Sequence, residues 1–206
     1  MTDKYALALH TTSPELGLAL SNFAGDVRSQ VWGLGRSLST HLHYHLAEFL
    51  QPHSWAALSF IAVAKGPGSY TSTRMGVVTA RTLAQQLDIP LFAISSLEAI
   101  AHSEKSQAEI LAIQLPAQSG SVYTGIYQVT ADNGITSLLP DSVMTIDAWQ
   151  KTLESWHTPY KLIKPESGLG STVTSILELA YLDWQQCKLP TWAEALPFYG
   201  QHPVNL

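Results

Sequence analysis

The residues most able to do chemistry lie in a glycine-rich loop that joins an apolar, β-branched run at 58–65 to a helical pattern ending at Leu87. Such a turn can hold phosphate, because the free N–H groups at the start of a helix point at the ligand. A Walker A loop needs Lys and then Ser or Thr after its last glycine, which this loop does not have. Two interpretations stay open, a phosphate site or a tight strand-to-helix connection, and both use the loop residues Gly66, Pro67, Gly68, Ser69 and Thr71.

Three histidines, His41, His43 and His45, suggest a metal site at first sight. They fall in a segment at 37–50 whose leucines recur at helical spacing, so we predict a helix there. On a helix His41 and His45 share a face while His43 points elsewhere, and one ion cannot be held by all three. We therefore expect solvated histidines and no metal site.

The order of the predicted elements indicates the fold. Three short apolar runs before residue 33 are joined by turn residues and are followed by helix, strand, helix and strand. This β-β-β-α-β-α-β order resembles the ribonuclease-H-like and actin-like ATPase fold. We predict an α/β protein of two similar subdomains, each a mixed sheet flanked by helices. The N-terminal subdomain would cover 1–105 and a smaller, diverged one 106–195, with the tail 196–206 docking back.

Catalytic groups are scarce along the chain. There is no GxSxG motif, and Cys187 lies in a polar stretch. Enzymes of the actin-like fold hold magnesium and phosphate with a carboxylate where the first strand turns, whereas His10, Thr11 and Thr12 occupy that place here. We therefore expect no catalytic residue and no cofactor in this chain.

A row of small residues marks the helix expected at 70–87. Gly76, Ala80 and Ala84 recur at four-residue spacing, with Leu83 on much the same face. Small residues let another element approach closely. Because glycine inside a helix costs about 1 kcal/mol relative to alanine, we expect the space at Gly76 to be used. The row either receives a helix of a partner or packs against the protein's own sheet.

Composition excludes several classes of protein. Of the 206 residues 46% are hydrophobic and 13% charged, and the net charge of −5 gives no basic footprint for binding nucleic acid alone. A single cysteine excludes a disulfide framework. The N-terminus opens into a predicted strand rather than a signal peptide, and no apolar run reaches membrane-spanning length. We expect a cytoplasmic protein without membrane contact.

Several motifs together carry a family resemblance. The segment GPGSYT at 66–71, followed by Arg74-Met75-Gly76, resembles the most specific motif of the TsaB (YeaZ) family. The runs at 6–12 and 91–97 are similar to its opening strand and to the continuation of its central motif, and Pro197-Phe198-Tyr199 is similar to its closing motif. The likeness spans most of the chain and is strongest over 58–97.

The chain also departs from the family pattern. His10 stands where the family has Asp, and Pro116-Ala117-Gln118 stands where it has Asp-Ala-Arg. Gly200-Gln201 replaces the common Leu-Arg after the closing motif. Each change removes a charged or site-like residue, which fits a subunit that does no chemistry itself.

The resemblance implies a non-catalytic scaffold that binds and activates TsaD, the enzyme that transfers threonylcarbamoyl to the adenosine next to the anticodon of ANN-reading tRNAs. TsaE would join a larger complex, ATP and Mg would be used by the partner subunits, and tRNA would be met only through the complex. The isolated chain would form a homodimer. The alternative is a nucleotide- or phosphate-dependent enzyme of the actin-like superfamily, kinase-like or glycoprotease-like. Carried onto this sequence, the TsaD interface comprises the helices at 37–50 and 70–87 with Leu42, Leu46, Tyr70, Arg74, Gly76, Ala80, Leu83 and Ala84.

Overall fold

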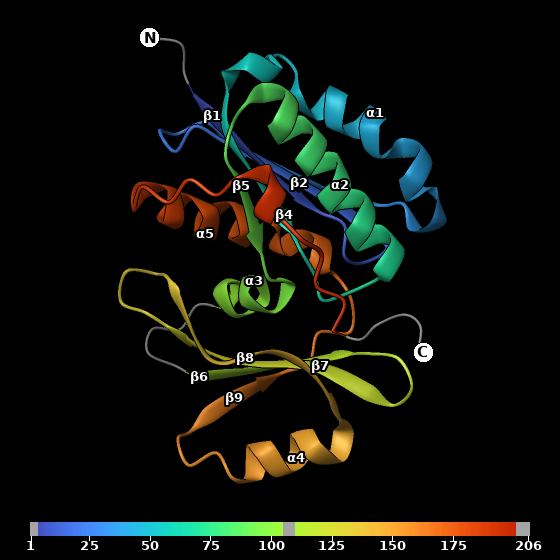
Figure 1. Ribbon diagram of the computed structural model, residues 1–206, viewed down its shortest axis with the longest axis vertical. Coiled ribbons are helices and arrows are strands. Elements are labelled where there is room, and N and C mark those ends of the chain that lie inside the picture. Colours follow the sequence, from blue (N-terminus) through green and yellow to red (C-terminus); the bar gives the residue numbers. More distant parts are fainter. Residues whose placement is uncertain (1–3, 105–109, 201–206) are drawn as a thin grey trace.

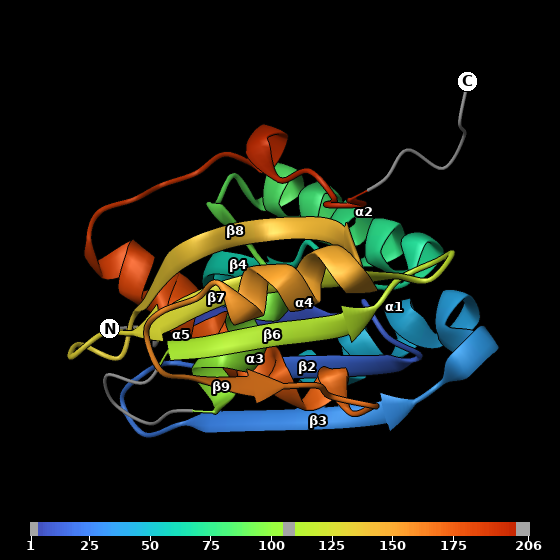
Figure 2. The same ribbon diagram turned by 90° about the horizontal axis from the view of Figure 1, so that it is seen from below.

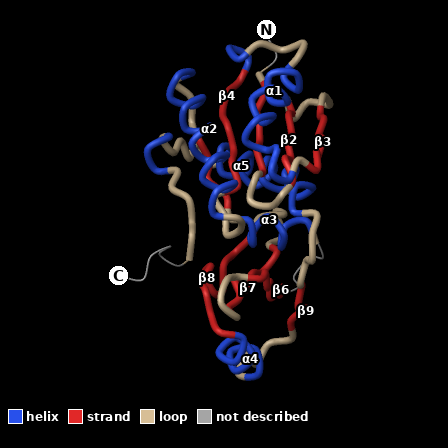
Figure 3. The backbone as a smooth tube through the Cα atoms, turned by 90° about the vertical axis from the view of Figure 1, so that its right-hand side faces the viewer, coloured by secondary structure: helices blue, strands red, loops and turns tan. Residues whose placement is uncertain are grey.

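A computed structural model describes residues 4–104 and 110–200 and shows five layers along its long axis (Figure 1). Helices α1 (Leu38–Leu50) and α2 (Tyr70–Leu87) form the first layer and a five-stranded sheet the second. Helices α5 (Val173–Gln185) and α3 (Ser96–Ser103) form the third. A four-stranded sheet and helix α4 complete the stack, and the side view separates the two sheets clearly (Figure 3). The α/β architecture of two mixed sheets flanked by helices, predicted from the element order, is confirmed.

The first sheet has the strand order β3-β2-β1-β4-β5. Strands β1, β2 and β3 form an antiparallel meander. Strand β4 pairs in parallel with β1, and β5 in parallel with β4, through helical crossovers, as expected for the fold. The five strands are Tyr5–His10, Glu15–Ser21, Val27–Gly33, Leu58–Ala64 and Leu91–Ile94.

Side chains alternate along β1 and divide the core of the first sheet in two. Leu7 and Leu9 point to α1 (Leu38–Leu50) and α2 (Tyr70–Leu87). Ala6 and Ala8 point to the opposite face, where α5 (Val173–Gln185) packs. Strand β1 thus contributes small side chains to the α5 side of the sheet, where Phe60 and Phe92 supply the larger ones, and leucines to the side of α1 and α2.

The second sheet has the order β8-β7-β6-β9, and α4 (Ile146–Glu154) covers its outer face (Figure 2). Asn133 has a left-handed backbone in the turn between β7 and β8, where the Asp-Asn-Gly sequence is found. On the inner face, α3 (Ser96–Ser103) packs with Leu97 and Ile100 against β6 and β7. The strands are Ile110–Pro116, Ser121–Val129, Ile135–Thr145 and Tyr160–Ile163.

The predicted range of the second subdomain, 106–195, requires a correction. Helix α5 lies within that range, yet its residues Ile176 and Ala180 pack into the core of the first sheet. The chain therefore crosses back after β9, and the second sheet is an insertion between α3 and α5. Four short 3-10 helices join these elements: Gly35–Ser37, Trp55–Ala57, Leu169–Thr172 and Trp192–Glu194.

The C-terminal segment lies along the first sheet as far as it is described. The Phe198 N–H donates to the carbonyl oxygen of Lys65 at 2.7 Å, and the Tyr199 ring lies 4.4 Å from the Tyr70 ring at the start of α2. The rest of the expected tail, 201–206, lies outside the described residues. Among the helices of the described residues, none combines the length and apolar character needed to cross a membrane.

Candidate functional site

The glycine-rich loop ties three parts of the chain together. The Ser69 N–H donates to the Thr12 carbonyl at 2.7 Å, and the Gly66 carbonyl accepts from the Ser96 N–H at 2.8 Å. A β-carbon at Gly68 would lie 2.2 Å from the Thr12 carbonyl oxygen, so only glycine fits there. Pro67 is buried beside it, while Ser69 and Thr71 are exposed at the start of α2. These contacts favour the tight strand-to-helix connection of the two interpretations.

The end of β1, where a nucleotide site would be expected in an actin-like enzyme, is buried and not accessible to solvent. His10, Thr11 and Thr12 are at most 1% exposed. The Thr12 hydroxyl lies 3.0 Å from the Ser96 hydroxyl, and the His10 Nε2 lies 3.5 Å from Thr12 Oγ1. Burial lowers the pKa of His10 to about 3, so the imidazole is neutral at pH 7.

The predicted small-residue row does not form an open surface. Gly76, Ala80 and Ala84 are buried on the side of α2 that faces the first sheet. A β-carbon at Gly76 would lie 2.1 Å from Thr11 Oγ1, so this glycine lets α2 pass over the end of β1. The interpretation as a partner surface is therefore wrong for these three residues, and the packing against the protein's own sheet is observed.

Two further predicted interface residues, Leu42 and Leu46, also belong to the core, at 0% and 3% exposure. They fill the space between α1 and the sheet, and Leu46 alone also reaches the floor of a surface groove. Leu42 is therefore wrong as an outward partner contact, whereas Leu46, although 3% exposed, still lines the groove. A leucine stripe on a helix faces the protein's own core before it can serve a second protein.

An open groove nevertheless runs between α1 and α2, with a volume of about 590 Å³. Arg74 and Leu83 from the predicted set line it, and Tyr70, 39% exposed, lies just before it at the start of α2. Val78 is 51% exposed in its wall and was missed by the sequence analysis. The sequence contains a sign of this exposure: Arg74, Val78 and Thr82 recur at four-residue spacing, so Val78 is the one apolar residue in a polar stripe of the helix. The groove is lined by His43, Leu46, Trp55, Thr71, Arg74, Met75, Val78, Thr79, Thr82 and Leu83.

The three histidines of α1 have different surroundings. His45 is half-buried against the Trp32 ring at 4.6 Å, and its ring centroid is 6.2 Å from that of His41. His43 is exposed and lines the groove. Within residues 4–104 and 110–200, His, Cys, Asp and Glu form no group of three that could hold a metal ion.

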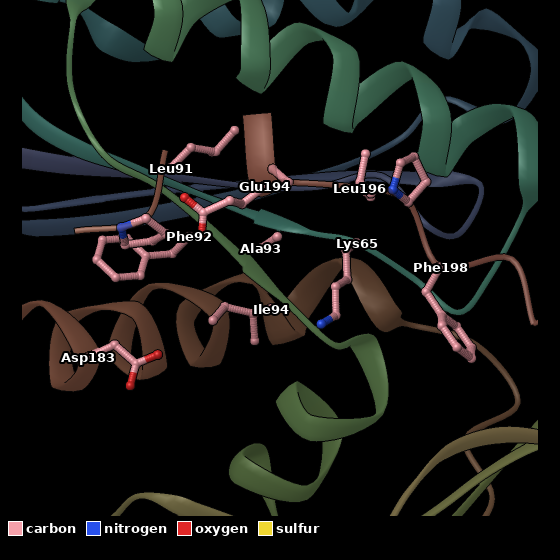
Figure 4. A pocket seen from close by; sticks show the side chains of 12 residues that line it. Lys65, Leu91, Phe92, Ala93, Ile94, Asp183, Glu194, Leu196 and Phe198 are labelled. Atoms are coloured by element: carbon pink, nitrogen blue, oxygen red, sulfur yellow. The ribbon is translucent and has the colours of Figure 1, made fainter. Parts of the chain in front are cut away.

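A second cavity of about 430 Å³ follows the outer edge of β5 (Figure 4). Its opposite wall is the C-terminal segment from Pro190 to Phe198, and Asp183 on α5 borders it. Lys65 and Glu194 are its charged groups nearest the centre of the view. Glu194 already accepts from the Thr191 N–H and hydroxyl at 2.8 Å, so its carboxylate serves the local turn.

A carboxyl cluster lies beside this cavity, between the two sheets. Asp141 on β8 accepts hydrogen bonds from the hydroxyls of Tyr127 and Ser95, the latter at 2.5 Å. Burial raises the pKa of Glu98 to about 7, an effect that Lys65 partly offsets and Asp141 reinforces. The cluster ties the start of α3 to the second sheet through its hydrogen bonds.

Comparison with known proteins gives consistent results. A family model described as TsaD: tRNA N6-adenosine threonylcarbamoyltransferase matches residues 41–176. The tRNA threonylcarbamoyladenosine biosynthesis protein TsaB of Bacillus subtilis is 34% identical over 166 residues, 79% of this chain and 72% of that protein. TsaB of Buchnera aphidicola subsp. Schizaphis graminum is 35% identical over 129 residues, 58% of this chain and 61% of that protein.

A solved structure with a similar fold is also known. A crystal structure from Pseudomonas aeruginosa, described as an uncharacterized protein with similarity to peptidase YEAZ, aligns with a TM-score of 0.80 and 22% identity. The alignment covers 96% of this chain and all of that one, and at this identity it supports the fold alone. The family model and the Bacillus relative extend over most of the chain, so this chain belongs to the TsaD-like family of that model and, within it, to the TsaB family of tRNA threonylcarbamoyladenosine biosynthesis proteins.

Proposed function

We propose that this chain is a non-catalytic subunit that binds TsaD through the α1–α2 face and supports threonylcarbamoyl transfer to tRNA. The observation that carries the proposal is the open groove of about 590 Å³ between the two helices. Its wall exposes half of the Val78 side chain, and Tyr44 and Tyr70 on the same two helices are 57% and 39% exposed. Exposed apolar and aromatic side chains around a groove are typical of a surface that receives another protein.

The arrangement at the end of β1 supports an accessory role. A ligand cannot reach His10, Thr11 or Thr12 in this conformation, because neighbouring residues cover them. The loop glycines support the same conclusion, since their close contacts are to Thr12 and to the C-terminal segment. In this proposal the chain has no active site of its own, ATP and Mg are used by partner subunits, and TsaE joins the assembly in the cytoplasm. The isolated chain pairs with itself through the same face, and tRNA is met only through the complex.

Pairing with TsaD from the same organism tests the proposal, by size-exclusion chromatography with light scattering. We expect a one-to-one complex with the wild-type chain and none with Val78→Glu, since a carboxylate replaces an apolar contact in the groove. Val27→Glu is the matched control, because Val27 is 66% exposed on the edge strand β3, away from the groove. A wild-type chain that elutes alone beside TsaD would contradict the proposal. A thermal shift with ATP and Mg on the isolated chain would then favour an enzyme of the actin-like superfamily.

A further inference from the structure

The arginines of this chain divide into two kinds. All four lie between residues 28 and 81. Arg28 donates to the Leu50 carbonyl at 3.0 Å and lies over the Phe49 ring, and Arg81 lies over the Trp192 ring at 5.5 Å. Arg36 and Arg74 are exposed, and neither guanidinium has a hydrogen bond or an ion pair to a residue that the structure describes. Arg74 lies near enough to Tyr199 to act on the pKa of that phenol, which burial raises overall. Two arginines are thus held by contacts inside the chain, and the guanidinium groups of the other two keep their hydrogen-bonding capacity for another molecule.

Both free arginines belong to one continuous surface. Arg74 lines the groove between α1 and α2, and Arg36 lines a neighbouring cavity of about 410 Å³. The two cavities share Thr71 and Met75, so one leads into the other. The second cavity is formed by residues at the N-terminal ends of both helices, including Ser39 and Ser72. Arg36 and Arg74 therefore lie toward the same end of the α1–α2 face.

No carboxylate lines either cavity. The chain as a whole has 16 acidic residues against 11 Lys and Arg, so two arginine-bearing cavities without Asp or Glu in their walls differ from the average surface. The acidic residues that end these helices, Glu48 on α1 and Asp88 after α2, lie at the opposite end. Glu48 also accepts a hydrogen bond from Tyr44, which raises the pKa of that phenol.

From these contacts we infer that the part of TsaD that enters the α1–α2 groove carries carboxylates that pair with Arg36 and Arg74. The inference rests on the proposed function and adds the chemistry and the orientation of the partner. Val78, Met75 and Leu83 receive apolar side chains of TsaD, and the two guanidinium groups each take a carboxylate in two parallel hydrogen bonds. Because both arginines lie at one end of the groove, the carboxylates fix the orientation of TsaD along it.

A second copy of this chain fits the surface less well. The same face of a second copy offers two more arginines and no carboxylate from its cavity walls. Like charges brought together at an interface cost binding energy, and an unpaired buried guanidinium costs more. Charge complementarity thus favours a different protein with acidic side chains over self-association.

The test measures the affinity for TsaD by calorimetry at low and high salt, with charge-reversed variants. We expect Arg74→Glu and Arg36→Glu each to weaken binding by about 30-fold or more at low salt. Lys151→Glu is the control, because it makes the same charge change on the exposed surface of α4, far from the groove. We expect Lys151→Glu to change affinity by less than about 3-fold. Arg74→Met, which keeps the apolar stem, should weaken binding and reduce its dependence on salt.

A charge swap provides the decisive result. Acidic surface residues of TsaD are replaced one at a time by Arg, and one replacement should restore binding to Arg74→Glu. If every variant binds TsaD as tightly as the wild type and salt has no effect, the carboxylates are absent and this inference is overturned while the proposed function stands. If the variants lose only self-association, the face serves a second copy and the inference is likewise overturned. If the wild type itself does not bind TsaD, the proposed function and the inference fail together. Thermal denaturation of each variant ensures that only folded proteins are compared.

Discussion

The hydroxyl of Thr11, at the end of β1, occupies the space that a β-carbon at Gly76 in α2 would need. The ideal β-carbon would lie 2.1 Å from Thr11 Oγ1 and 3.2 Å from its Cβ, and the same hydroxyl donates to the Ser72 carbonyl at 2.8 Å. Helix α2 is therefore fixed over the first strand by a contact that only glycine permits. This relationship explains why a helix tolerates a glycine in its interior.

Gly76→Ala should destabilise the protein despite the better helix propensity of alanine. The gain of about 1 kcal/mol from propensity is opposed by an overlap with Thr11 that costs about 1–3 kcal/mol or more. We expect a net loss of up to about 2 kcal/mol in the free energy of unfolding, measured by urea denaturation. The control is Gly33→Ala at the end of β3, where a β-carbon meets nothing within 4 Å. Equal stability of the two variants would contradict the close contact.

Ala80→Leu should act on folding before it acts on any partner. Ala80 is fully buried against the first sheet, so three extra carbons overpack the core and cost about 1–3 kcal/mol. Val78→Leu, two residues away and half exposed, should change stability by less than about 0.5 kcal/mol. Chemical denaturation of both variants checks the assignment of the two faces of α2. A stable Ala80→Leu protein would show that this side of the helix is open.

Glu98 should make the protein less stable as pH rises. Its pKa is about 7 in the folded chain, above the ordinary value of 4.5, because burial disfavours the charged form. The folded state therefore holds the proton more tightly, and stability falls between pH 4.5 and 7 by on the order of 3 kcal/mol. Glu98→Gln should remove this slope and be more stable than the wild type at pH 8. Glu154→Gln, at an exposed position of α4, should leave the slope unchanged.

His10 should produce the opposite trend. Its pKa falls from 6.5 to about 3 on burial, and its Nδ1 has no hydrogen-bond partner among the described residues. The unfolded state therefore binds the proton more tightly, and stability is lost as pH falls from 6.5 towards 3. His10→Gln should flatten this acid limb in pH-dependent thermal denaturation, whereas the exposed His157→Gln should not. An unchanged acid limb in His10→Gln would show that His10 does not set it.

Local patterns were sufficient for most of the secondary structure. The apolar run at 58–65 and the break before Leu91 led to β4, α2 and β5 within a residue or two of their observed ends. The Ser-Ser-Leu-Glu sequence at 95–98 is typical of a helix start, and the Ser95 hydroxyl accepts from the N–H groups of Leu97 and Glu98. These features depend on the spacing of apolar residues and on capping residues, and both are set by residues close together in the sequence.

Strand β8 lacks a local strand pattern over most of its length. It contains Pro140 and several exposed polar residues, so it has neither a β-branched run nor a clear alternation. Such a strand is stable only because β7 supplies its ladder, and proline is tolerated because β8 is at the edge of the sheet. Pairing between strands is a tertiary property that a local pattern does not contain.

By itself, the sequence determined the fold class, the order of the elements in the first sheet and the family to which the chain belongs, because these follow from periodicity and from motifs that are local. The tertiary structure alone decided that Gly76, Ala80 and Ala84 face the protein's own sheet and that α5 returns to it. It also decided that Arg36 and Arg74 share one open surface. Periodicity groups residues on one face of a helix, but which face meets the core depends on what packs against it.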